Sequence, residues 1–297
     1  MTSENERADI STRSTDVGRE TTPARFTLTP RVIAAYAAGI GDTNPVYFDD
    51  DRPGGLIGHP GLIWRFQWHS QSVPGVTVPP EIRRRSVAAF ADARFARSFR
   101  EGDTITAQAR LIAVRQIPPG VLSVNRWTMR DARGALVCEL DYAGIVRGAR
   151  VEGGDRAIAE TPPLPHPASR DGEPLWTVRI PIAREAAHIY TECADIWNPI
   201  HTERRVALAA GLPDIILHGS ATLMLGVREI VNRCLDADPS RLRRFAGQFR
   251  AMVIPGTAIT VRCHEDRRES DGTRAIFWDA LNAEGGYAVA NGVVLAT

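Results

Sequence analysis

The residues best suited to chemistry are gathered between Tyr190 and Ser220. This stretch contains two histidines, His201 and His218, and a nearby carboxylate, Asp195. A histidine beside a carboxylate can move a proton, and free backbone N–H groups at a helix start can stabilise charge on a carbonyl oxygen. The set is therefore suited to proton transfer next to a polarised carbonyl group.

A turn and a helix start are expected to position these groups. Pro199 fixes its own φ and keeps Asn198 out of the helical region, so His201 should lie just beyond a turn. Apolar residues from Leu223 onward recur mostly every three or four positions, which predicts a buried helix starting near Gly219. The first N–H groups of that helix lack partners within it and favour a partial negative charge.

The turn occurs twice in the chain. Tyr36, Asn44, Pro45 and Tyr47 precede Tyr190, Asn198, Pro199 and His201 by 154 positions, and the same offset relates Phe95 to Phe249, Gly102 to Gly256 and Ile105 to Ile259. One constant offset over about 70 residues of each copy is typical of a repeated structural unit. The sequence therefore indicates a tandem duplication.

The duplication divides the chain into four parts. We predict a disordered tail over residues 1–22, a first domain over 23–150, a proline-rich linker over 151–174 and a second domain over 175–297. In each domain a short strand, the turn and an apolar helix precede several strands. The first apolar helix should be long and start near His59-Pro60-Gly61. Polar and apolar residues alternate in the strands, which predicts an α+β unit whose antiparallel sheet wraps the helix.

Composition excludes several classes of function. The formal net charge of +1 argues against bulk attraction to nucleic acid or an acidic membrane, and we find no run of about 18 apolar residues that would span a membrane. The polar N-terminus does not resemble a secretory signal, so a cytoplasmic protein is expected. All 36 basic residues are arginine, which excludes a lysine Schiff base or a Walker A lysine. The four cysteines form no CxxC pair and predict no metal site.

Two motifs carry a resemblance to a known family. NPIH at Asn198 to His201, followed by ILHG at Ile216 to Gly219, resembles the MaoC-like dehydratase family, also called hydratase 2, of the hot dog fold. GDTNPVY, which ends at Tyr47, resembles the degenerate first half of double hot dog members. The resemblance implies a tandem hot dog protein. It also implies (R)-specific hydration of trans-2-enoyl thioesters, or dehydration of 3-hydroxyacyl thioesters, carried on coenzyme A or a carrier protein. No cofactor is implied.

The resemblance also assigns roles to residues. His201 corresponds to the family's acid/base, and Gly219 to the residue whose N–H holds the thioester oxygen. The second half would be catalytic, and the first half would provide the acyl pocket. Asn198 is expected to fix the turn and to bind substrate, together with five further residues, namely His218, Ser220, Tyr190, Asp42 and Tyr47.

The family's aspartate is displaced in this chain. Its usual position, two residues before the motif's asparagine, is Ile196 in the second half, whereas the first half has Asp42 there but Tyr47 at the histidine position. The partner of His201 is therefore open between Asp195 after a one-residue backbone shift, Tyr190, Glu192 or water, and Asp42 from across the interface between the halves.

Two other functions remain as alternatives to a hydratase. The separation of aspartate and histidine between the halves also suits a protein that binds acyl thioesters without converting them. A hot dog thioesterase would need a carboxylate near the start of the long helix, where Glu229 lies too far along. A tandem pair can act as a pseudo-dimer or associate again as a homodimer.

Overall fold

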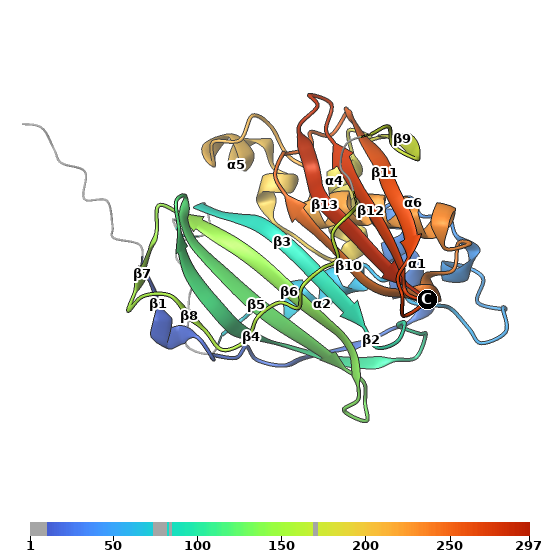
Figure 1. Cartoon of the computed structure of the whole chain (residues 1–297), viewed down its shortest axis with the longest axis horizontal. Helices are drawn as coiled ribbons and strands as arrows, with labels where there is room; N and C mark the ends of the chain where they lie inside the picture. Colours follow the sequence, from blue (N-terminus) through green and yellow to red (C-terminus); the bar gives the residue numbers. More distant parts are fainter. Residues whose placement is uncertain (1–10, 74–81, 83–84, 169–171) are drawn as a thin grey trace, which may run out of the picture.

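The two copies build one continuous antiparallel sheet (Figure 1). A computed structural model describes residues 11–73, 82, 85–168 and 172–297. The strands of the first copy are β2 (Ala24–Thr27), β3 (Ser86–Phe95), β4 (Thr104–Ile117), β5 (Gly120–Arg130) and β6 (Leu136–Arg147). Those of the second copy are β9 (Trp176–Pro181), β10 (Leu242–Phe249), β11 (Ala258–Arg268), β12 (Arg274–Leu281) and β13 (Tyr287–Ala296).

The strand order shows the duplication directly. Along the sheet it is β2-β4-β5-β6-β3-β10-β13-β12-β11-β9, so the second copy repeats the first in mirror order. The copies join where β3 pairs with β10 in antiparallel register, with Ala93 opposite Phe245. Gly102 and Gly256, one repeat apart, both have positive φ, at 80° and 89°. The predicted α+β class and the tandem repeat are confirmed.

The helices are α1 (Pro30–Gly39), α2 (Leu62–His69), α4 (Ala186–Ala194), α5 (Arg204–Ala209) and α6 (Gly219–Cys234). Of these, α2 and α6 pack against one face of the sheet (Figure 1), α1 and α4 pack against each other, and α5 contacts the Asn-Pro turn that precedes it. Ten of the 16 residues of α6 are buried, as its apolar spacing predicts. None of the helices within the described residues is both long and apolar enough to cross a membrane.

The first copy's helix is shorter than we predicted. α2 has only eight residues and ends before Ser70. The hydroxyl of Ser70 donates to the carbonyl oxygen of Phe66 and accepts a hydrogen bond from the indole of Trp127. A buried serine that bonds to its own turn and to a strand of the sheet favours a helix end at this point.

The segments expected as tail and linker carry structure of their own. Within the expected tail, β1 (Ser11–Arg13) pairs with β7 (Arg150–Glu152). The N–H of Thr21 donates to the carbonyl oxygen of Ala109 in β4, and the N–H of Ala109 donates to the hydroxyl of Thr21. The described tail residues are therefore ordered, and residues 1–10 lie outside the described residues. β8 (Arg156–Ala157) of the linker pairs with β4.

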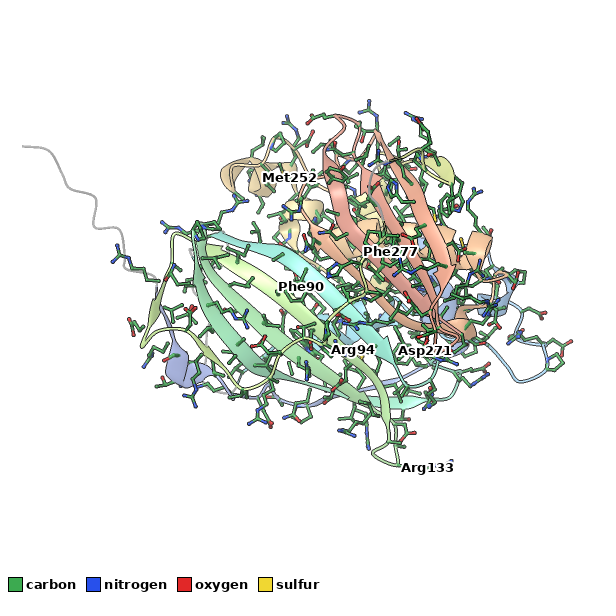
Figure 2. The ribbon with its side chains drawn as sticks, in the orientation of Figure 1. Phe90, Arg94, Arg133, Met252, Asp271 and Phe277 are labelled. Carbon is green, nitrogen blue, oxygen red and sulfur yellow. The ribbon has the colours of Figure 1, made fainter. Side chains whose placement is uncertain are left out.

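The linker crosses the outer face of the sheet where the copies meet (Figure 1). Arg244 of β10 donates to the carbonyl oxygens of Pro162 and Pro163, and its guanidinium also pairs with Asp92 of β3. Arg94 of β3 lies on the same face (Figure 2), where its guanidinium is among buried carboxylates. Proline has no N–H with which to pair to a strand, so this segment is held instead through its carbonyl oxygens, which accept hydrogen bonds from an arginine side chain.

Candidate functional site

The Asn-Pro turn holds His201 as the sequence predicts. Pro199 begins a short 3-10 helix, η3 (Pro199–His201), and the side chain of Asn198 accepts a hydrogen bond from the N–H of Ile200 at 3.4 Å. The backbone N–H of His201 donates to the carbonyl oxygen of Asn198. The asparagine thus closes the turn from both its side chain and its backbone, and fixes the direction in which the histidine leaves it.

A short hydrogen bond defines the tautomer of His201. Its Nδ1 lies 2.7 Å from the carbonyl oxygen of Ile216. A carbonyl oxygen can only accept, so Nδ1 carries the proton and Nε2 retains a lone pair. Burial lowers the pKa of His201 to about 4, although the bond to Ile216 opposes this shift. At neutral pH the imidazole is uncharged, with Nε2 available as a base.

His218 lies directly against this base. The two imidazole rings are stacked, with centroids 3.7 Å apart and an angle of 26° between their planes. Nε2 of His218 is 3.3 Å from the carbonyl oxygen of Ile196 and donates to it. Burial, followed by the nearness of His201, lowers the pKa of His218 to about 2. Both rings are therefore neutral, and a proton taken up by His201 would have to be passed on.

The N–H of Gly219 is a free donor at the start of α6. His218 is the N-cap residue in an extended conformation, with φ −57° and ψ 135°, and makes no side-chain cap bond. Within the described residues the N–H of Gly219 has no hydrogen-bond partner. A Cβ at Gly219 would lie 3.2 Å from the ring of Phe249, so glycine allows close packing here. This donor, at the positive end of a 16-residue helix, suits a developing oxyanion.

The corresponding groups of the first half are occupied. Nε2 of His59 lies 3.4 Å from Oδ2 of Asp42, and Nδ1 of His59 accepts from the N–H of Gly61 at 3.0 Å. The ring of Tyr47 contacts His59, as the ring of His201 contacts His218. The residue after His59 is Pro60, which has no N–H. The first half therefore lacks both the histidine base and the free donor.

Asp42 stays within its own half. Its Oδ1 accepts from the N–H of Asn44 at 3.1 Å, while Oδ2 faces His59. Burial would raise the pKa of Asp42, but the hydrogen bonds from His59 and the backbone outweigh it, so the net pKa is lowered and the group is ionised. Its counterpart one repeat later is Ile196, whose carbonyl oxygen receives the hydrogen bond from His218.

Asp195 occupies a different position from the one expected by a one-residue shift. It is the C-cap of α4 in the left-handed conformation, with φ 56°. One repeat earlier Gly41, which follows the C-cap Ile40 of α1, also has a positive φ of 62°. The carboxylate of Asp195 is 2.7 Å from Arg65 and 3.0 Å from His69, both on α2, and is 48% exposed. The structure thus brings His201, His218 and Gly219 together, and pairs the carboxylate of Asp195 with the first half.

Sequence reasoning missed a further residue, Tyr36. Its hydroxyl lies 2.9 Å from that of Tyr190, and the hydroxyl of Tyr190 donates to Oγ of Ser220 at 3.1 Å. Tyr36 and Tyr190 are the same position in the two copies. The repeat alone contains this signal, because residues on a two-fold axis contact their own counterparts.

The neutral, buried histidine pair should make stability depend on pH. Unfolded histidine has a pKa near 6.5, whereas that of His201 is about 4 in the folded protein, so the unfolded chain binds more protons between these values. The free energy of unfolding should fall by about 2 kcal/mol from His201 alone when the pH is lowered from 7 to 5. Urea unfolding of the wild type and of His201→Asn at both pH values measures this change. An equal loss of unfolding free energy between pH 7 and pH 5 in the two proteins would contradict the prediction.

Comparisons with known proteins match a dehydratase-type domain to each half of the chain. Residues 168–277 match the MaoC like domain, and residues 15–140 match the FAS1-like dehydratase domain region. An enoyl-CoA hydratase of Mycobacterium tuberculosis is 25% identical over 274 residues, which cover 85% of this chain and 88% of that protein.

Solved structures show the same fold. A MaoC-like dehydratase from Phytophthora capsici superposes with a TM-score of 0.78 at 19% identity, covering 94% of this chain and 96% of the other. A conserved Mycobacterium tuberculosis protein with a double hot dog fold superposes with a TM-score of 0.60 at 16% identity, covering 94% and 96%. The tandem hot dog fold expected from the motifs is confirmed.

Proposed function

This chain belongs to the MaoC-like dehydratase family, and from that premise we propose that it is a hydro-lyase acting on acyl thioesters. It adds water (R)-specifically to trans-2-enoyl thioesters, or removes water from 3-hydroxyacyl thioesters. The observation that carries the proposal is the pairing of a neutral histidine base, His201, with the free N–H of Gly219. The mycobacterial relative is named an enoyl-CoA hydratase, which favours coenzyme A as the carrier.

The chemistry follows from the two groups. Nε2 of His201 takes a proton from water as the water oxygen bonds to C3 of the enoyl group. The electrons of the double bond move toward the thioester oxygen, whose charge is stabilised by the N–H of Gly219 and the dipole of α6. The protonated imidazole then gives its proton to C2. Because His201 is buried against His218, its charged form is short-lived and the return of the proton is favoured.

The two halves have separate tasks in this proposal. Asn198 holds the catalytic turn, while Tyr190, Ser220 and His218 surround the reacting end of the substrate. The first half has Tyr47 and Pro60 where the second half has His201 and Gly219, and it contributes the wall along which the acyl chain lies. Loss of one catalytic set leaves room for longer or branched chains.

The ultraviolet absorbance of a conjugated enoyl-CoA tests the activity. Purified protein should remove the signal, and chiral analysis of the 3-hydroxyacyl product should give the (R) form. The same acyl group on a carrier protein distinguishes the two carriers by their kcat/KM. A protein that binds a series of short, long and branched enoyl thioesters without converting any of them would instead be a binding protein, and one that releases free thiol would be a thioesterase.

Asp195→Asn tests the displaced carboxylate. Asparagine tolerates the left-handed conformation, and the lost ion pair with Arg65 and the altered contact with His69 are partly exposed, so we expect kcat/KM within about twofold of the wild type and a stability loss of at most about 1 kcal/mol. Steady-state kinetics and thermal unfolding measure both. Asp214→Asn, at another half-exposed ion pair, serves as the control. A loss of 100-fold in kcat would give Asp195 a place in the chemistry.

A further inference from the structure

A chain of three hydroxyl groups connects the inactive half to the catalytic helix. It begins at Tyr36 of α1, passes through Tyr190 of α4 and ends at Ser220, the second residue of α6 and the neighbour of Gly219. The two tyrosine side chains are almost fully buried, with exposures of 0% and 1%, whereas Ser220 is partly exposed. The chain thus runs from the core to the donor end of the helix.

The direction of the hydrogen bonds can be derived. Burial raises the pKa of Tyr190 to about 12 and that of Tyr36 well above its usual value, so both hydroxyls keep their protons. The hydroxyl of Tyr190 donates a hydrogen bond to Oγ of Ser220, so the hydroxyl of Tyr36 must be the donor in the bond between the two tyrosines. Oγ of Ser220 is therefore an acceptor toward Tyr190, and its own proton is directed elsewhere.

The first half has no equivalent of this chain. The residue in the place of Ser220, two positions after the helix-start histidine, is Gly61. A Cβ at Gly61 would lie 2.4 Å from the hydroxyl oxygen of Tyr36, so no larger side chain fits there. Within the described residues Tyr36 bonds through its hydroxyl to Tyr190 alone. Because only the second half has a serine at this position, the hydrogen bonds run in one direction, from Tyr36 through Tyr190 to Ser220.

We propose that Ser220 is a second donor to the thioester oxygen, beside the N–H of Gly219, and that Tyr36 of the first half is a positioning residue that orients it through Tyr190. The assignment rests on the proposed function of this site. It explains why the half that has lost its own chemistry keeps a buried tyrosine on the axis between the halves. Successive hydrogen bonds along the chain polarise one another, which makes the terminal hydroxyl a better donor.

Kinetics of four variants test the chain. Ser220→Ala should lower kcat by about 100-fold, as loss of one oxyanion donor does. Tyr36→Phe removes a single neutral hydrogen bond and should lower kcat by about 3- to 10-fold with KM unchanged. In the double variant, Tyr36→Phe should add less than about twofold to the effect of Ser220→Ala, because the two act through one hydroxyl. Tyr142 is a partly buried tyrosine beside Trp64 and Trp127, and Tyr142→Phe serves as the control and should change nothing.

A spectroscopic measurement separates this proposal from the activity itself. Butanoyl-CoA labelled with ¹³C at the thioester carbonyl cannot be hydrated, and its infrared carbonyl band should shift to lower frequency on binding. In Tyr36→Phe the band of the bound ligand should move part of the way back to its frequency in free solution, and in Ser220→Ala it should move further back. A bound band that responds in this way supports the chain even where enoyl thioesters are not hydrated. A working hydratase whose rate and carbonyl band are the same in Tyr36→Phe and Tyr142→Phe would overturn it.

Discussion

Replacing His201 with asparagine is expected to reduce kcat for enoyl thioester hydration by about 1,000-fold, within the range that a positioned general base contributes. Asparagine can still donate to the carbonyl oxygen of Ile216, as Nδ1 of His201 does at 2.7 Å, so the turn should keep its shape. What disappears is the lone pair of Nε2. Because that atom acts in the transition state, KM should change little.

The control for this variant is another histidine in a polar contact. Nε2 of His264 lies 2.8 Å from Asp279 on the outer face of the sheet, so His264→Asn changes a polar histidine contact without touching the site, and its rate should match the wild type. Thermal unfolding of both variants shows whether they fold. A well-folded His201→Asn protein that hydrates substrate within tenfold of the wild-type rate would remove His201 from the role of base.

The pH profile offers an independent check on the same residue. Since burial lowers the pKa of His201 to about 4, the neutral base persists far below the pKa of 6.5 of an ordinary histidine. The kcat/KM of the wild type should therefore stay nearly constant from pH 7 to pH 5 and fall only near pH 4. A decline centred on pH 6.5 would show that the base of the free enzyme is a different, more exposed histidine.

Replacing Gly219 with proline is expected to lower kcat by about 100- to 1,000-fold. Proline is favoured at the first position of a helix, and the extended conformation of His218, with ψ 135°, suits a residue that precedes proline. The substitution therefore removes one N–H that has no partner among the residues that the structure describes, and leaves the helix intact. In the first half a proline also follows the histidine, because Pro60 follows His59, but α2 begins two residues later at Leu62.

Gly219→Ala is the matched control. Both variants place a Cβ 3.2 Å from the ring of Phe249, but only alanine keeps the N–H. The alanine variant should lose less than about tenfold in kcat, which measures the effect of crowding alone. Circular dichroism and thermal unfolding check that α6 persists. Equal losses in the two variants would mean that crowding, and not the missing donor, explains the effect.

Local chemistry and the repeat made much of this site predictable. The Asn198-Pro199 turn has a local cause, and the structure confirms it. The helix start at Gly219 likewise follows from apolar spacing in the next turns. The constant offset between the copies predicted a duplicated fold, and the mirror order of the strands is its result.

The remaining features depend on contacts between distant segments. The short sequence separation between Asp195 and His201 made Asp195 a candidate for the carboxylate that pairs with this histidine. In the structure Asp195 is a left-handed helix cap, and its side chain contacts α2. Comparison with Gly41 would have suggested this, because glycine one repeat earlier marks a position with positive φ. The stacking of His218 on His201 joins segments that are apart in the sequence, and the end of α2 depends in part on the bond between Ser70 and the distant Trp127.

The pairing of β3 with β10 has a consequence for folding during synthesis. The first half is synthesised before β10, so the ten residues of β3 form an open sheet edge with unpaired N–H and C=O groups until β10 has been made. The second half of another newly made chain can pair with this edge as well as the chain's own second half can. Two chains that exchange halves in this way would form all the contacts between β3 and β10. The fraction of such domain-swapped dimers should rise with the rate of synthesis.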